Sequence, residues 1–154
     1  MRRQSTLVGL VSMIGALMAD RLFKHLVWWR LNTNLPDIET RLLRIGYYSN
    51  TGVGLGIRLP VWLIVGLSTM IIIGLVVWLT KRYTKISPIT RWAIGLILVG
   101  AISNLYDRIY YGHVIDVINI LDWSVFNAAD VWIVAGVFIV MVEMIANNKT
   151  TTKT

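Results

Sequence analysis

Two aspartates, Asp116 and Asp130, lie fourteen positions apart beside an apolar run of membrane-spanning length. Ionisable side chains are costly at membrane depth and are retained mainly for a function or a charged partner. Two carboxylates that lie close together can share a proton and activate a water molecule. If the fold brings these two together, we expect an aspartyl hydrolase that works at a membrane surface.

Each aspartate also has a purely structural interpretation. Asn127 and Asp130 have the spacing of a capping box, in which the acid returns a hydrogen bond to the start of a helix. A helix start stabilises the ionised carboxylate, so capping is compatible with Asp130 accepting a proton. Asp116 lies in an apolar run with strand-like alternation, where burial would favour its protonated form. The alternative for Asp116 is an exposed loop acid that pairs with Arg108 or Lys24.

Polar residues near the ends of other apolar runs are further candidates. Asp20 and Lys24 are four positions apart with the acid first, which favours a helical ion pair as the default. In the functional alternative, one of them contacts a polar part of a substrate. Asn104 and Arg108 share one face of a helix with Gly100, whose size suits close helix packing. Asn104 could instead order a neighbouring helix, and Arg108 could be an interfacial anchor.

The segment 50–56, Asn-Thr-Gly-Val-Gly-Leu-Gly, is rich in alternating glycines. Such a pattern usually forms a turn, and it lacks the strand-to-helix context of a dinucleotide-binding motif. The missing side chains at Gly52 and Gly54 would let a peptide backbone approach closely. We therefore expect a flap that faces the substrate, with an inert turn as the alternative.

Composition places these residues in a membrane protein. Of the 154 residues, 56% are hydrophobic and 15% charged, and the mean hydropathy is +0.65. Soluble domains are nearer half apolar and a quarter charged. We expect one integral membrane domain over residues 1–154. The absence of cysteine excludes disulfides and thiol chemistry, and the two histidines lack zinc-site spacing, so we expect neither metal nor cofactor.

Four apolar runs reach the roughly 20 residues needed to cross a bilayer. They cover about 7–26, 59–79, 92–109 and 126–145, and three of them admit polar residues at one end. The fold class is therefore a membrane α-helical protein with four transmembrane helices. A cleavable signal peptide at the N-terminus is disfavoured, because Leu17 rather than a small residue precedes Ala19 by two positions.

The charge distribution predicts the orientation of these spans. Eight basic residues fall on the side of the two termini and seven on the other, while only one of the eight acids falls on the terminal side. The excess of positive charge marks that side as cytoplasmic, with both termini inside. The same distribution argues against a nucleic-acid partner for the net charge of +7. The polar residues of three spans then lie at one depth, near the extracytoplasmic interface.

The connection 27–58 is too long for a tight turn. Segments 42–48 and 55–59 are apolar or β-prone and flank the glycines, which predicts a small extracytoplasmic sheet between the first two helices. Segment 114–120 could add a strand. Tryptophans and tyrosines concentrate in these connections and fit an aromatic belt at the headgroup level.

Taken together, these segments resemble the bacterial lipoprotein signal peptidases (signal peptidase II) over roughly residues 20–134. The matching boxes are 20–24, 50–56, 100–116 and 126–130. All of them occur in the family's order, and both aspartates and the nearby asparagines are intact. Four positions depart from the family's usual residues: Gly54, Leu55, Val99 and Ser103.

The resemblance implies a membrane aspartyl endopeptidase of the bacterial cytoplasmic membrane, with its site at the extracytoplasmic face and no cofactor. Its substrate would be a prolipoprotein whose lipobox cysteine carries a diacylglyceryl group, cut just before that cysteine. Asp116 and Asp130 would hold the water. The implied positioning residues are Asp20, Lys24, Asn50, Gly52, Gly54, Asn104, Arg108 and Asn127. Membrane lipids are further partners, and a monomer is expected. The alternative is a small proton-coupled transporter that uses the same carboxylates as a relay.

Overall fold

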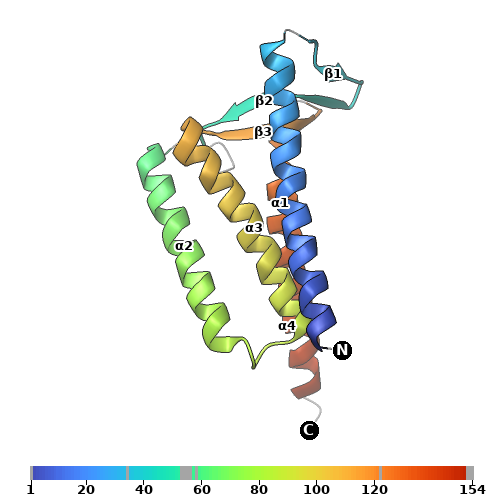
Figure 1. The fold of residues 1–154 in the computed structure, drawn as a ribbon, viewed down its shortest axis with the longest axis vertical. Helices are drawn as coiled ribbons and strands as arrows, with labels where there is room; N and C mark the ends of the chain where they lie inside the picture. The colour runs from blue at the N-terminus through green and yellow to red at the C-terminus, as the bar shows by residue number, and fades with distance from the viewer. Residues whose placement is uncertain (1, 34, 53–56, 58, 122, 152–154) are drawn as a thin grey trace.

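The computed structural model describes residues 2–33, 35–52, 57, 59–121 and 123–151, with side chains between positions 7 and 146. Four helices stand side by side, and a small sheet covers the end opposite to the two termini (Figure 1). The helices are α1 (Arg2–Asn32), α2 (Val61–Arg82), α3 (Pro88–Tyr111) and α4 (Ala128–Thr151). The strands are β1 (Ile38–Glu39), β2 (Leu43–Asn50), β3 (Val114–Ile120) and β4 (Ser124–Phe126).

Each predicted apolar run overlaps one helix, and every helix continues beyond the C-terminal end of its run. Helix ends depend on capping rather than on apolarity alone. In α3, the Ser87 hydroxyl accepts a hydrogen bond from the Thr90 N–H at the start. At the other end, Gly112 adopts a φ of 77°, which glycine tolerates best, and its N–H donates to the Arg108 carbonyl.

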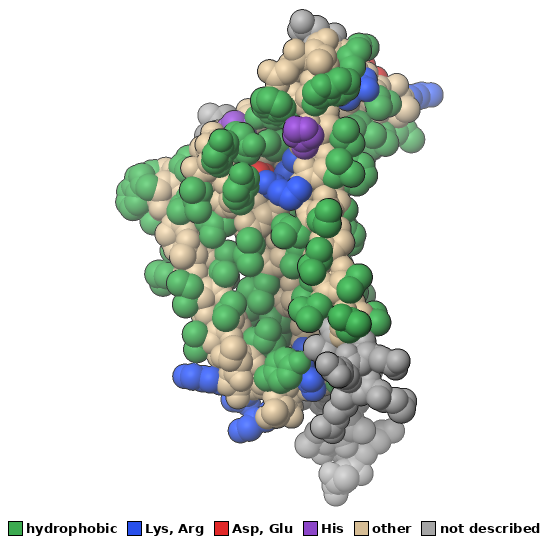
Figure 2. All heavy atoms as spheres, in the orientation of Figure 1, with side chains coloured by type: hydrophobic (Ala, Val, Ile, Leu, Met, Phe, Trp, Pro, Cys, Tyr) green, Lys and Arg blue, Asp and Glu red, His purple; other side chains and the backbone are tan. Residues whose placement is uncertain are grey.

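Within the part of the chain that the structure describes, three helices are long and apolar enough to cross a membrane. They are α2, α3 and residues Ala128–Ala146 of α4. Helix α1 is not among them and carries Asp20, Arg21 and Lys24. Hydrophobic side chains cover the middle of the face seen in Figure 2, while Lys and Arg lie toward the two ends, at the α2–α3 connection and near the sheet. This is the surface of an integral membrane protein.

The sheet is antiparallel in the order β1-β2-β3-β4. The expected pairing of 42–48 with 55–59 is wrong, because β2 lies between β1 and β3. Ile57 and Leu59 are not in a strand, and residues 55, 56 and 58 lie outside the described residues. The sheet therefore draws on the α1–α2 and α3–α4 connections rather than only on the one between α1 and α2. Six of the seven residues of β3 pair with β2, whereas the run after the glycines is cut short by Pro60.

The two faces of β3 have different neighbours. Ile115 and Val117 point to a buried apolar cluster that contains Val27 of α1. Val114 and Asp116, on the alternate face, line a polar cavity. The predicted strand 114–120 is confirmed. Because side chains alternate along it, Asp116 faces the cavity while its neighbours Ile115 and Val117 face the apolar cluster.

Helices α3 and α4 approach closely at glycines. A Cβ at Gly100 would overlap the Ala129 carbonyl oxygen, and a Cβ at Gly136 would overlap that of Ala93. The packing role expected for Gly100 is confirmed. It lets the start of α4 lie directly against α3, which places Asp130 beside the polar residues of that helix.

Candidate active site

The structure brings Asp116 and Asp130 to one place. Asn127 links them, because its Nδ2 donates to Asp116 Oδ1 at 2.7 Å and its Oδ1 accepts from the Asp130 N–H at 3.0 Å. Both aspartates line the same polar cavity of about 180 Å³. The fold therefore brings the two carboxylates to one cavity, which is the condition that the sequence analysis set for shared chemistry.

Asp130 is held at the start of α4 by a capping box. The Asn127 N–H donates to Asp130 Oδ2 at 3.2 Å, and the Asn127 side chain returns the bond. A third bond comes from α3, where Asn104 Nδ2 donates to Asp130 Oδ1 at 2.8 Å. Asp130 therefore caps the helix and lines the cavity at the same time.

Asp116 is fully buried in β3, so the interpretation as an exposed loop acid is wrong. Its carboxylate accepts hydrogen bonds from Asn127 and from Asn50 Nδ2, the latter at 2.9 Å. Burial raises the pKa of Asp116 from 3.8 to about 6, and the charge of Asp130 adds to the rise while the amide donors oppose it. Asp116 therefore keeps its proton up to about pH 6, above the range of an ordinary aspartate.

Arg108 ties the glycine segment to α3. Its Nη2 donates to the Gly52 carbonyl at 3.0 Å, and its Nη1 donates to the Asn104 carbonyl at 3.4 Å. Arg108 also lines the cavity, so it is more than an interfacial anchor. Asn50 and Gly52 lie in the cavity wall as well, joined by a bond from the Gly52 N–H to Asn50 Oδ1 at 2.9 Å. Gly54 lies outside the described residues.

Asp20 and Lys24 form the predicted ion pair, with 3.0 Å between Asp20 Oδ2 and Lys24 Nζ. Both are buried and do not belong to the cavity lining. They belong to a larger cluster that the sequence did not reveal, in which Arg21 and Asp107 pair at 2.8 Å. Helical spacing was the available signal, since Asp107 follows Gly100 and Asn104 on one face of α3.

One departure from the family pattern is explained by this cluster. The hydroxyl of Ser103, where the family usually has glycine, donates to Asp20 Oδ2 at 2.5 Å. A charged acceptor makes such a bond stronger than a neutral one. Nothing in the structure explains Val99, and Leu55 lies outside the described residues.

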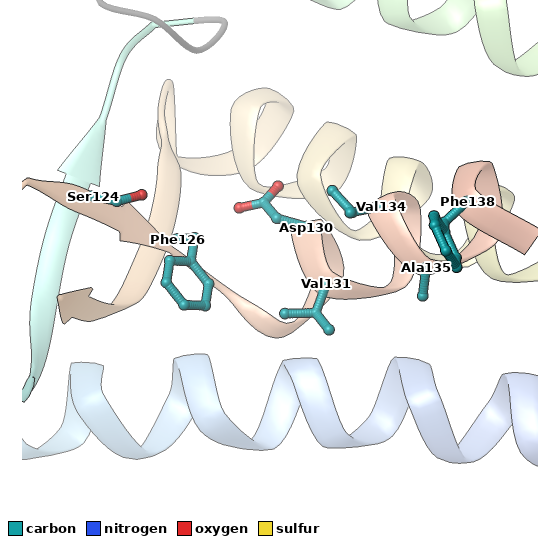
Figure 3. Close-up of a pocket in the computed structure, with 7 residues that line it drawn as sticks. All are labelled: Ser124, Phe126, Asp130, Val131, Val134, Ala135 and Phe138. Atoms are coloured by element: carbon teal, nitrogen blue, oxygen red, sulfur yellow. The ribbon is translucent and has the colours of Figure 1, made fainter.

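No group of three or more Asp, Glu or His side chains able to hold a metal ion occurs among the described residues. A second, apolar groove of about 490 Å³ runs from Asp130 along α4. Figure 3 shows the Asp130 carboxylate at the head of the helix, with Val134 and Phe138 following along it and Phe126 before it. One carboxylate therefore borders both a polar cavity and an apolar groove, which suits a reaction on a polar bond attached to an apolar group.

Comparison with known proteins identifies relatives over most of the chain. The family model for signal peptidase (SPase) II matches residues 12–146. A lipoprotein signal peptidase of Syntrophomonas wolfei is 33% identical over 144 residues, which cover 90% of this chain and 93% of the relative. One from Fusobacterium nucleatum is 39% identical over 138 residues (86% and 83% of the two chains). One from Bacillus subtilis is 33% identical over 137 residues (84% and 88%).

Solved structures show the same fold. A bacterial membrane enzyme solved by the in meso method at 2.3 Å resolution superposes with a TM-score of 0.79 at 22% identity, over 93% of this chain and 90% of the other. A second, at 1.9 Å resolution, gives a TM-score of 0.74 at 23% identity, over 89% and 92%. With a family model that matches almost the whole chain and relatives above 30% identity over most of their length, this chain belongs to the signal peptidase II family.

Proposed function

We propose that this protein is a membrane aspartic endopeptidase that removes signal peptides from prolipoproteins, cleaving just before a cysteine that carries a diacylglyceryl group. The observation that carries the proposal is the pair Asp116 and Asp130 at one polar cavity, joined through Asn127. The transporter alternative finds no support among the relatives, which are lipoprotein signal peptidases.

The proposed chemistry divides two roles between the aspartates. Asp130, at a helix start and among amide donors, takes a proton from water as the water oxygen bonds to the scissile carbonyl carbon. Asp116 donates its proton to the carbonyl oxygen, which gives a tetrahedral intermediate. The C–N bond then breaks as the leaving nitrogen takes the proton held by Asp130, while Asp116 takes back a proton from a hydroxyl group of the intermediate. The amides of Asn50, Asn104 and Asn127 hold the two carboxyl groups in place.

The polar cavity and the apolar groove suit the peptide backbone and the apolar part of such a substrate, respectively. The polar cavity of about 180 Å³ has room for a water molecule and a short stretch of peptide backbone. The groove of about 490 Å³ along α4 is lined mainly by apolar side chains and can take an acyl chain or an apolar stretch of signal peptide. Asn50 and Gly52 border the cavity, which supports the glycine segment as a substrate-facing flap.

The direct test is a cleavage assay with the purified full-length protein. The substrate is a peptide with a lipobox cysteine bearing a diacylglyceryl thioether, and the matched control is the same peptide with an unmodified cysteine. We expect cleavage before the lipidated cysteine and little cleavage of the control. Intact lipidated peptide after long incubation with well-folded protein would contradict the proposed function.

The proposal includes a topology with one domain, four spans, both termini in the cytoplasm and the site at the outer face of the bacterial cytoplasmic membrane, in a monomer. The sheet lies at the end opposite to the α2–α3 connection (Figure 1), and residues of β2 and β3 line the cavity. The end of α2 and the α2–α3 connection carry Lys81, Arg82 and Lys85, which supports this orientation. Helix α1 would cross as the fourth span because Asp20 and Lys24 are buried and Arg21 pairs with Asp107 of α3.

We expect an impermeant maleimide to label a cysteine introduced at Asp37 but not one at Thr84. Both side chains are exposed, so a difference in labelling reports the side of the membrane rather than burial. The native chain has no cysteine, which removes background labelling. Labelling is measured on intact cells, with permeabilised cells as the control. Labelling of position 84 alone would reverse the topology.

The pH dependence of cleavage should report on Asp116. Its pKa of about 6 means that the proton is present below pH 6 and lost above it. We therefore expect kcat/KM to fall as the pH rises through about 6 in the free enzyme. Bound substrate removes water from the cavity, so the corresponding fall in kcat should occur at a higher pH.

Replacing Asn50 with alanine removes a hydrogen bond that lowers the pKa of Asp116, so the fall in kcat/KM should move to a higher pH. A downward movement would contradict this assignment.

A further inference from the structure

The ammonium group of Lys24 has all three of its N–H donors engaged. Its Nζ lies 3.0 Å from Asp20 Oδ2, 2.8 Å from Asp107 Oδ2 and 2.9 Å from Asn104 Oδ1. The side chain is only 2% exposed. A lysine has three donors and no acceptor, so this geometry leaves none of them unsatisfied.

This arrangement determines the orientation of the Asn104 side-chain amide, that is, whether its oxygen or its NH2 group faces Lys24. Lys24 offers only donors, and an ammonium facing an amide NH2 would place donor against donor. The Asn104 oxygen must therefore face Lys24, which leaves its NH2 to face Asp130 at 2.8 Å. Asn127 Nδ2 donates to the same oxygen at 3.2 Å and supports the same orientation.

The rest of the cluster balances charge and holds the start of α4. Two acids, Asp20 and Asp107, face two bases, Lys24 and Arg21. The second oxygen of Asp20 accepts the Ala129 N–H at 2.9 Å, one residue before Asp130. Buried charges are tolerated when they are paired and hydrogen-bonded in this way.

We infer that Lys24 is a positioning residue for catalysis, which acts through Asn104 by presenting the amide donor of Asn104 to Asp130. This inference rests on the proposed peptidase function and assigns to Lys24 no contact with the substrate. Without the ammonium, the Asn104 amide is free to turn its oxygen toward the Asp130 carboxylate. The Asn104 oxygen would then face an oxygen of the Asp130 carboxylate, at the place where the water is activated. We therefore expect kcat to fall and KM to stay nearly unchanged.

The test variant removes Lys24 without leaving the cluster charged. In Lys24→Met with Asp20→Asn, the remaining pair is Arg21 and Asp107, and the amide oxygen at position 20 still accepts the Ala129 N–H. The matched control is Arg21→Met with Asp107→Asn, which removes the other acid and the other base of the cluster. Both Lys24 and the Ile115 N–H bond to Oδ2 of Asp107, so the amide oxygen at position 107 keeps both contacts.

We expect the test variant to lose about 100-fold in kcat with KM within about threefold, since one lost donor at a reacting group costs about that much. The control should stay within about threefold of the native kcat. Changing Asn104 to alanine should add nothing further to the test variant, because Lys24 acts through that amide. Lys24→Gln with Asp20→Asn, which restores an N–H donor toward Asn104, should recover most of the kcat.

Equal kcat in the test and control variants would overturn the inference, as would a full additional loss from Asn104→Ala. If the methionine variant does not fold, the glutamine variant decides: kcat close to the native value supports the role, and a 100-fold loss overturns it. A native protein that does not cleave the lipidated peptide would instead refute the proposed function.

Discussion

Replacing either Asp116 or Asp130 with asparagine should lower kcat for the lipidated peptide by about 10⁴-fold, as loss of one member of a catalytic unit does. The amide keeps the size of the carboxyl group but neither takes a proton from water nor passes one to the carbonyl oxygen. Insertion and folding should persist, because an amide oxygen at position 130 can still accept the Asn127 N–H. The measurement is single-turnover cleavage by each purified variant.

Asp37→Asn provides the control for this pair. Asp37 is exposed in the connection between α1 and α2 and lines neither cavity nor groove, so the variant's turnover should match that of the native protein. In the proposed dyad the two aspartates act as a unit, so the double variant should be no slower than the worse single variant. Near-normal turnover by Asp130→Asn would remove this residue from the proposed dyad.

Replacing Gly100 with alanine should cause a loss of about 100-fold in kcat. The added Cβ would overlap the Ala129 carbonyl oxygen and crowd Ile133, so the first turn of α4 must move away from α3. A displacement of about 1 Å at a catalytic group costs about that factor in rate. Asp130 would be carried with the turn, away from Asn104. The effect should appear in kcat and in a lower thermal midpoint.

Gly74→Ala is the matched control. Gly74 lies in α2, where a Cβ meets no atom within 4 Å. Alanine also has the higher helix propensity, so this variant should be as stable as the native protein and equally active. If Gly100→Ala and Gly74→Ala gave the same rate and the same thermal midpoint, the close approach of α3 and α4 would not control the position of Asp130.

The local features of this chain were determined by the sequence alone. The apolar runs predict the four helices because a helix needs about 20 mostly apolar residues to cross a bilayer, a property of composition and length that can be read along the chain. The capping box of Asn127 and Asp130 and the pair of Asp20 and Lys24 join residues three or four positions apart, so helical geometry suffices to predict them.

Contacts between distant segments were decided by the tertiary structure. Strand β2 pairs with β3 across dozens of intervening residues, and strand propensity does not select a partner. That pairing sets Tyr48 opposite Asp116 and carries Asn50 to the carboxylate. The orientation of the Asn104 amide and the pairing of Arg21 with Asp107 likewise depend on three helices meeting at one depth. A hydrogen bond or an ion pair acts over a few ångströms, so its partner is known only once packing has placed both groups.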